Sequence, residues 1–158
     1  MDKRRLTIIV ILLAVCILGV VGFVVWQGNR HARIDEWSIG ITADGFDWAE
    51  VSTGYGIEKK SYSLPEEDLK ELVNLLQAVT EQNCTRKTPK DAERTGYRLA
   101  LRYEGKLWLF HCLSNGMIRI VFEDPETAAY YGCRDSGLYS EHEDLYHYIC
   151  HLVESEAE

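Results

Sequence analysis

Three side chains near the C-terminal end could together hold a metal ion. Glu143, His147 and His151 are spaced four residues apart, which would place them on one face of a helix. Imidazole nitrogens and a carboxylate oxygen are common zinc ligands. The same spacing is also typical of a solvated polar helix face with weak contacts between turns. Because the chain lacks a His-Glu-x-x-His arrangement, we expect the polar face, with no metal site and no cofactor.

Four cysteines of the main domain could form disulfides. Cys84, Cys112, Cys133 and Cys150 are an even set, and three pairings of them are possible. Their spacing lacks the paired C-x-x-C knuckles of a structural zinc site. Two disulfides would fit an oxidising compartment, with Cys84–Cys112 and Cys133–Cys150 slightly favoured, whereas free buried thiols are the alternative.

Aromatic side chains could form a platform for a glycan or a peptide. The candidates are Trp37, Trp48, Trp108, Tyr130, Tyr131 and Tyr139. Most should fill the core, because aromatic rings supply much of the buried area of a small domain. The adjacent pair Tyr130 and Tyr131, which precedes a glycine, is the best candidate for an exposed binding surface.

Signatures of catalysis are absent from the sequence. There is no G-x-S-x-G nucleophile elbow, no catalytic cysteine signature and no phosphate-binding glycine motif. His111 and Cys112 are adjacent but would point to opposite faces of a strand. The sequence therefore favours a protein that is not an enzyme.

The N-terminal region predicts a membrane anchor. The run 6–26 holds no charged residue and follows Lys3, Arg4 and Arg5, so its length and flank are typical of a single-pass signal anchor with a cytoplasmic N-terminus. A cleaved signal peptide and a lipoprotein signal ending at Cys16 are the alternatives. The first lacks a small-x-small cleavage site, and the second would need a small residue in place of Val15.

The remainder of the chain is acidic. Residues 27–158 carry 24 acidic and 14 basic side chains, a net charge of −10, which argues against nucleic acid as a partner. Five segments result: a basic cytoplasmic N-terminus (1–5), a transmembrane anchor (6–26), a juxtamembrane linker (27–36), an extracytoplasmic domain (37–153) and an acidic tail (154–158).

The domain pattern predicts an α+β fold with an antiparallel sheet. Three strands over 97–122 form a meander with turns at Glu104-Gly105 and Asn115-Gly116. One or two further strands precede them, at 37–42 and 48–52. Two-residue turns would set Leu101 opposite Trp108, Leu99 opposite Phe110, and Phe110 opposite Val121. Helices near 64–81 and 141–154, each opened by a capping box, would pack on the sheet.

These features lead to three functional hypotheses. The first is a non-catalytic binding or accessory domain at the cell membrane, with a protein or envelope component as its partner and residues 6–26 in the bilayer. The second is a small extracytoplasmic hydrolase or metal-dependent enzyme with an unrecognised site. The third is an accessory subunit of a membrane complex.

Overall fold

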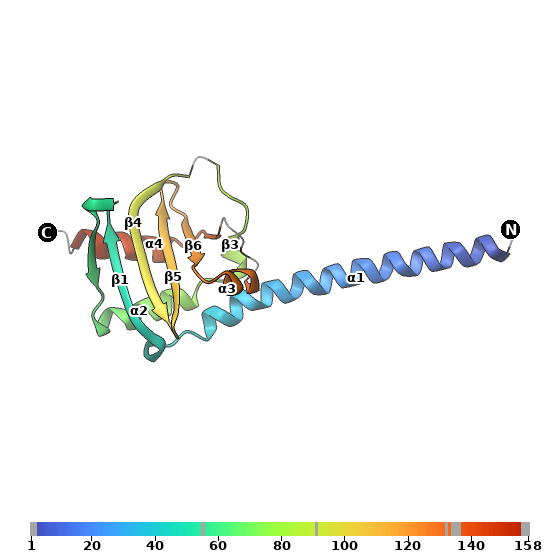
Figure 1. Cartoon of the computed structure of the whole chain (residues 1–158), viewed down its shortest axis with the longest axis horizontal. Helices are drawn as coiled ribbons and strands as arrows, with labels where there is room; N and C mark the ends of the chain where they lie inside the picture. The colour runs from blue at the N-terminus through green and yellow to red at the C-terminus, as the bar shows by residue number, and fades with distance from the viewer. Residues whose placement is uncertain (1–2, 55, 91, 132, 134–136, 156–158) are drawn as a thin grey trace. The chain divides into compact units, whose positions relative to one another are not determined.

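The chain divides into two compact units, Met1–Ala32 and Arg33–Glu158. The computed structural model describes residues 3–54, 56–90, 92–131, 133 and 137–155, without the side chains of 3–8, 10 and 26–33. Helix α1 (Lys3–Ile39) supplies the first unit, and its last residues begin the second unit, which holds all the strands (Figure 1). In the first unit the described apolar side chains, Ile9 and those from Ile11 to Val25, are exposed.

The predicted transmembrane anchor over 6–26 is contradicted by the structure. Within the described residues, no helix combines the length and the apolar character that crossing a membrane requires. The side chains of Lys3, Arg4 and Arg5, which support the predicted orientation, lie outside the described set, as does most of the predicted tail, 156–158.

The second unit is α+β and contains one seven-stranded antiparallel sheet (Figure 1). Its order is β2-β1-β4-β5-β6-β7-β3. The strands are β1 (Phe46–Thr53), β2 (Lys60–Ser63), β3 (Cys84–Thr85), β4 (Arg94–Tyr103), β5 (Lys106–Leu113), β6 (Ile118–Phe122) and β7 (Leu138–Ser140). The helices of this unit after α1 are α2 (Glu66–Gln77), α3 (Pro125–Tyr130) and α4 (Glu143–Ser155), with short 3-10 turns at Ala43–Gly45, Gly56–Glu58 and Glu81–Asn83.

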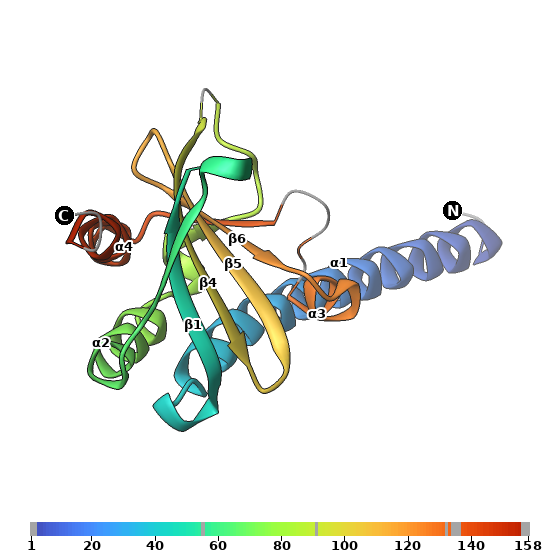
Figure 2. The same cartoon turned by 60° about the vertical axis from the view of Figure 1, so that its left-hand side comes forward.

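One face of the sheet carries the hydrophobic core. Alternate strand residues such as Leu99, Leu101, Phe110 and Ile120 are fully buried there. Figure 2 shows α2 and α4 together on one side of the strands, and their apolar stripes join this core through Leu72, Leu76, Leu145, Ile149 and Val153. The two amphipathic helices therefore cover the sheet as the sequence predicts.

The register of the meander is correct for its first hairpin and wrong for its second. Leu99 pairs with Phe110 and Leu101 with Trp108, because Glu104 and Gly105 form a two-residue turn with positive φ at both positions. Phe110 pairs with Ile120 rather than Val121. The Leu113 amide donates to the carbonyl of Met117, so the loop holds three residues.

This one-residue shift in register moves every side chain of β6 to the opposite face of the sheet from the one predicted. The third loop residue, Gly116, has a φ of 81°, which suits a three-residue loop ending in a left-handed glycine. Ile118, Ile120 and Phe122 consequently join the core, whereas the prediction put them on the reverse face.

The predicted strand at 37–42 is wrong. Trp37 to Ile39 complete α1 instead, and Ile34, Trp37 and Ile41 are buried in the core. Alternation of apolar and polar residues over so short a segment does not distinguish a strand from a helix end whose buried residues recur at positions three and four apart.

The predicted capping boxes are also replaced. Pro65 is the N-cap of α2 and makes no side-chain cap bond. At the start of α4, the Leu145 amide donates to Nδ1 of His142 over 3.1 Å. The buried His142 thus takes the capping role that the sequence pattern gave to Ser140.

The reverse face of the sheet carries a row of polar side chains that is partly open to solvent. A single row of paired positions crosses β1, β4, β5 and β6, and it consists of Ser52, Arg98, His111 and Arg119 in that order. Burial, together with Arg94, Arg98 and Arg119, lowers the pKa of His111 to about 4. His111 is therefore neutral in the folded protein at pH 7.

We expect His111 to make the fold sensitive to mild acid. Because its folded pKa lies below its unfolded value, stability should fall as the pH drops from about 6.5 to 4, by at most about 1.4 kcal/mol per pH unit and less for a partly exposed group. In urea unfolding between about pH 6.5 and 4, the His111→Gln variant should lose less stability than the parent protein, because its side chain does not titrate. His151→Gln, on the exposed side of α4, is the control, and equal behaviour of the two variants would contradict the assignment.

All five cysteines are free thiols, and two of them meet between β5 and α4. The Cys112 thiol is fully buried, and a hydrogen bond between Cys112 and Cys150 raises the pKa of Cys112 and lowers that of Cys150. The geometry therefore favours a Cys112–Cys150 pair over the pairings Cys84–Cys112 and Cys133–Cys150.

Oxidation should link Cys112 to Cys150. The partly exposed Cys150 thiolate would attack a disulfide donor such as oxidised glutathione, and Cys112 would then displace the second glutathione, so that two thiols are oxidised and one disulfide is reduced. Peptide mapping without reductant should identify this bond in the chain and in a Cys84→Ser/Cys133→Ser variant. A dominant link that includes Cys84 or Cys133 would show the expectation to be wrong.

Candidate functional site: an aromatic pocket

A pocket lined by aromatic rings lies where the end of α1 meets the sheet and the end of α3. Its volume is about 230 Å³. Trp37 comes from α1, Tyr103 and Trp108 from the β4–β5 hairpin, and Tyr130 and Tyr131 from the end of α3. The remaining lining residues are Glu36, Gly40, Glu104 and Lys106. We call this set the aromatic pocket.

The rings of the aromatic pocket support one another. Tyr103 stacks on Trp108 with centroids 5.3 Å apart, and Trp37 meets Trp108 edge to face at 5.2 Å. Tyr131 contacts both Trp37 and Phe122 of the core. Such contacts fix the ring positions before any ligand arrives, which lowers the entropic cost of binding.

Two residues that line this pocket carry a buried hydrogen-bond donor with no partner among the described residues. The indole Nε1 atoms of Trp37 and Trp108 are sealed from solvent and unpaired among the described residues. The two residues are only 7% and 3% exposed. An unpaired buried donor costs about 1–3 kcal/mol, and buried tryptophan N–H groups ordinarily find an acceptor.

The rim of the pocket supplies charge and hydroxyl groups. Glu36, Glu104 and Lys106 are exposed there. Burial, with Tyr130 and Glu36 nearby, raises the pKa of Tyr131 to about 12, so its hydroxyl stays protonated at pH 7. The Tyr103 hydroxyl is already engaged, since it donates to the Gly40 carbonyl and accepts from the Thr42 amide.

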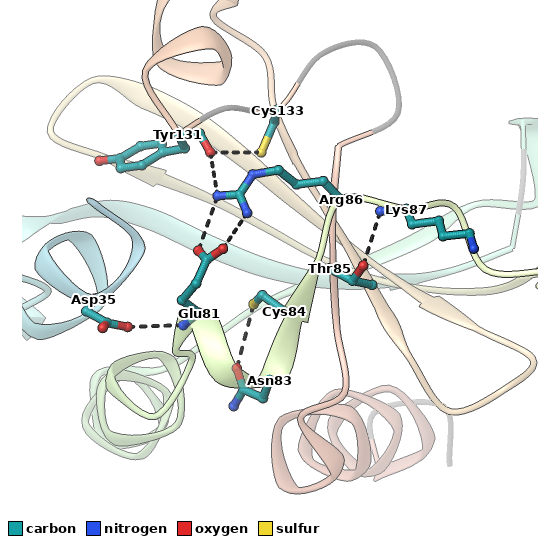
Figure 3. A network of polar contacts seen from close by, with 9 residues as sticks. All are labelled: Asp35, Glu81, Asn83, Cys84, Thr85, Arg86, Lys87, Tyr131 and Cys133. Atoms are coloured by element: carbon teal, nitrogen blue, oxygen red, sulfur yellow. Dashed lines mark hydrogen bonds and ion pairs between the residues drawn. The ribbon is translucent and has the colours of Figure 1, made fainter. Parts of the chain in front are cut away.

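An ion pair behind the pocket positions Tyr131. Arg86 forms a two-pronged contact with Glu81 and donates to the carbonyl oxygen of Tyr131 over 3.2 Å (Figure 3). The Glu81 amide donates to Oδ1 of Asp35 on α1 over 3.0 Å. Glu81 keeps only 10% of its side chain exposed and Arg86 keeps 25%. One guanidinium thus links the 3-10 turn after α2 to the segment that carries Tyr131.

The predicted aromatic platform is partly assembled. Four of the predicted residues line the pocket, namely Trp37, Trp108, Tyr130 and Tyr131. The other two, Trp48 and Tyr139, lie on the reverse face of the sheet, opposite Arg102 and Arg119. Tyr130, at 48% exposed, is the more open member of the predicted pair, and Tyr131 is partly buried. Sequence reasoning missed Tyr103, although strand alternation puts it on the same face as Leu99 and Leu101.

The metal candidate lies elsewhere, on the outer side of α4. His147 and Glu143 approach to 3.5 Å with side chains 69% and 86% exposed, and His151 is exposed one turn further on. Within the described part of the chain, no three histidine, cysteine or acidic side chains gather as a metal site would require.

Breaking the Arg86–Glu81 ion pair should loosen the pocket and the fold together. Arg86→Gln leaves the largely buried Glu81 carboxylate without its cation, so we expect the free energy of unfolding to fall by about 2–3 kcal/mol in urea titrations.

Two comparisons test the cause. Arg86→Gln/Glu81→Gln should recover part of the loss, because no charge is then left unpaired. Glu143→Gln, which removes the exposed Glu143–His147 pair, should change stability by less than about 0.5 kcal/mol. A loss in Arg86→Gln as small as that in Glu143→Gln would refute the structural role of Arg86.

No protein-family model, characterised protein or solved structure matches this chain. What the domain binds has therefore to be inferred from the chemistry of its side chains.

Proposed function

We propose that this domain is a non-catalytic binding module whose aromatic pocket receives a sugar residue of a glycan. The observation that carries the proposal is that five aromatic residues line one pocket whose rim bears exposed carboxylates. A ligand for this pocket must offer an apolar surface to the rings together with donors to the carboxylates.

A sugar ring provides both kinds of group. Its C–H faces can lie against aromatic rings. Its hydroxyls can donate to carboxylates, which Glu36 and Glu104 supply at the rim. A proline-rich peptide would fit the rings but offers no hydroxyl or amide hydrogens from its prolines to these carboxylates.

The surroundings of three histidines argue against a role in acid–base catalysis and so favour the binding proposal. His142 uses its Nδ1 to cap α4, and His111 is surrounded by arginines instead of a carboxylate partner. His147 pairs with Glu143 on an exposed helix surface. None of these three lines the aromatic pocket, whose own titratable groups are carboxylates, tyrosines and one lysine.

The test is calorimetric titration of the whole chain with a panel of mono- and oligosaccharides. At least one should bind, and Trp37→Phe should weaken it roughly tenfold, equivalent to about 1.4 kcal/mol, because the smaller ring leaves a gap in the wall of the pocket. Near-ultraviolet circular dichroism verifies that the variant keeps its fold.

Trp48→Phe is the matched control, because Trp48 is 40% exposed and does not line the pocket. Its affinity should equal that of the parent protein. Absence of binding by every sugar, binding of a proline-rich peptide instead, or equal losses in the two tryptophan variants would each overturn the proposal.

A further inference from the structure

A second cavity, on the reverse face of the sheet, gathers positive charge in an otherwise acidic protein. Its volume is about 130 Å³, and Lys59, Arg94, Arg98 and His111 line it. Ser52, Gly54, Gly56, Gly96 and Tyr97 complete the lining. The whole chain carries a net charge of −8, so this grouping of cations runs against the overall composition. We call it the cationic cavity.

The strand register forces these cations together. Arg98 is directly opposite His111, and His111 is directly opposite Arg119. Like charges at directly opposed positions destabilise a sheet. Burial and the three neighbouring arginines keep His111 neutral, which relieves the row only in part because Arg98 and Arg119 remain charged.

The balancing acid that contacts both Lys59 and Arg98 is Glu50. One of its oxygens, Oε1, lies 3.3 Å from Nζ of Lys59 and 3.7 Å from a terminal nitrogen of Arg98. A single carboxylate thus serves two cations. The Arg98 side chain is 25% exposed. Because a guanidinium has five N–H donors, Arg98 has donor capacity for a further anionic oxygen besides Glu50.

Glycines contribute no side chain to part of the cavity wall. Gly54 has a φ of 80°, and a Cβ at this position would meet the Glu58 carbonyl oxygen at 2.8 Å, so a side chain is excluded there. Gly56 and Gly96 likewise add no side chain to the lining. The wall therefore combines glycine backbone with cationic side chains and with the polar side chains of Ser52, Tyr97 and His111, and cationic donors of this kind bind oxyanions in proteins.

We propose that the cationic cavity binds a phosphate-type oxyanion, with Arg98 and Lys59 as its principal donors. The guanidinium of Arg98 would donate to the anion in a fork geometry, and the ammonium of Lys59 would supply a second charge. The anion neutralises the row of like charges that the register creates. This site is separate from the aromatic pocket, since the two share no lining residue.

Inorganic phosphate is the first probe, titrated into the whole chain at constant ionic strength and followed by calorimetry and by the His111 imidazole resonances. Phosphate should bind, and it should raise the pKa of His111 from about 4, because an anion in the cavity would offset the effect of Arg94, Arg98 and Arg119. O-phosphoserine is the second probe. Tighter binding of O-phosphoserine would identify an organic phosphate, and tighter binding of inorganic phosphate would identify the free ion.

Arg98→Gln should weaken phosphate binding at least tenfold, whereas Arg98→Lys should retain part of it. Arg102→Gln is the matched control: Arg102 lies on the same strand and the same face but is exposed and outside the cavity. It should bind as the parent does. Absence of a phosphate effect at constant ionic strength, or equal weakening by Arg98→Gln and Arg102→Gln, would overturn the proposal. Neither result would affect sugar binding at the aromatic pocket.

Discussion

Burial of one face of the antiparallel sheet is the constraint on which the rest of the domain depends. That face contains Leu99, Leu101, Trp108, Phe110 and Ile120, and helices α2 and α4 cover much of it. The end of α1 completes the cover with Ile34 and Trp37. Because Trp37 is required for the core and also lines the aromatic pocket, the same packing that stabilises the fold creates the candidate binding site.

The two faces of the sheet have consequently different chemistry. On the core face, aromatic rings meet at one end and line the aromatic pocket. On the reverse face, alternation along the strands places Arg98, His111 and Arg119 in one row. A row of like charges costs free energy in the isolated domain. An anionic ligand would relieve this cost on the reverse face, whereas a ligand of the aromatic pocket would use ring surface and rim carboxylates.

The half-buried ion pair between Arg86 and Glu81 shows how separate segments cooperate around the pocket. Arg86 contacts the carbonyl of Tyr131, and Glu81 accepts Arg86 while its amide donates to Asp35 (Figure 3). Residues from the end of α1, from the turn after α2 and from the segment after α3 are thereby joined by polar contacts. Since the geometry of an aromatic pocket depends on ring positions, these contacts are structural support for recognition.

Local sequence patterns determined the α+β class, the first hairpin and the two amphipathic helices, because turn residues and apolar periodicity act over a few neighbouring residues. They also singled out Tyr130 and Tyr131. The length of the second hairpin loop, the helical end of α1 at Trp37 and the capping role of His142 were decided by packing. The transmembrane interpretation of 6–26 rested on the length of the uncharged run and on its basic flank, and it is not supported by the described helices. Only the tertiary structure could join Trp37 to Trp108, or Arg98 to His111 and Arg119, because residues distant in the chain become neighbours through strand register and helix packing.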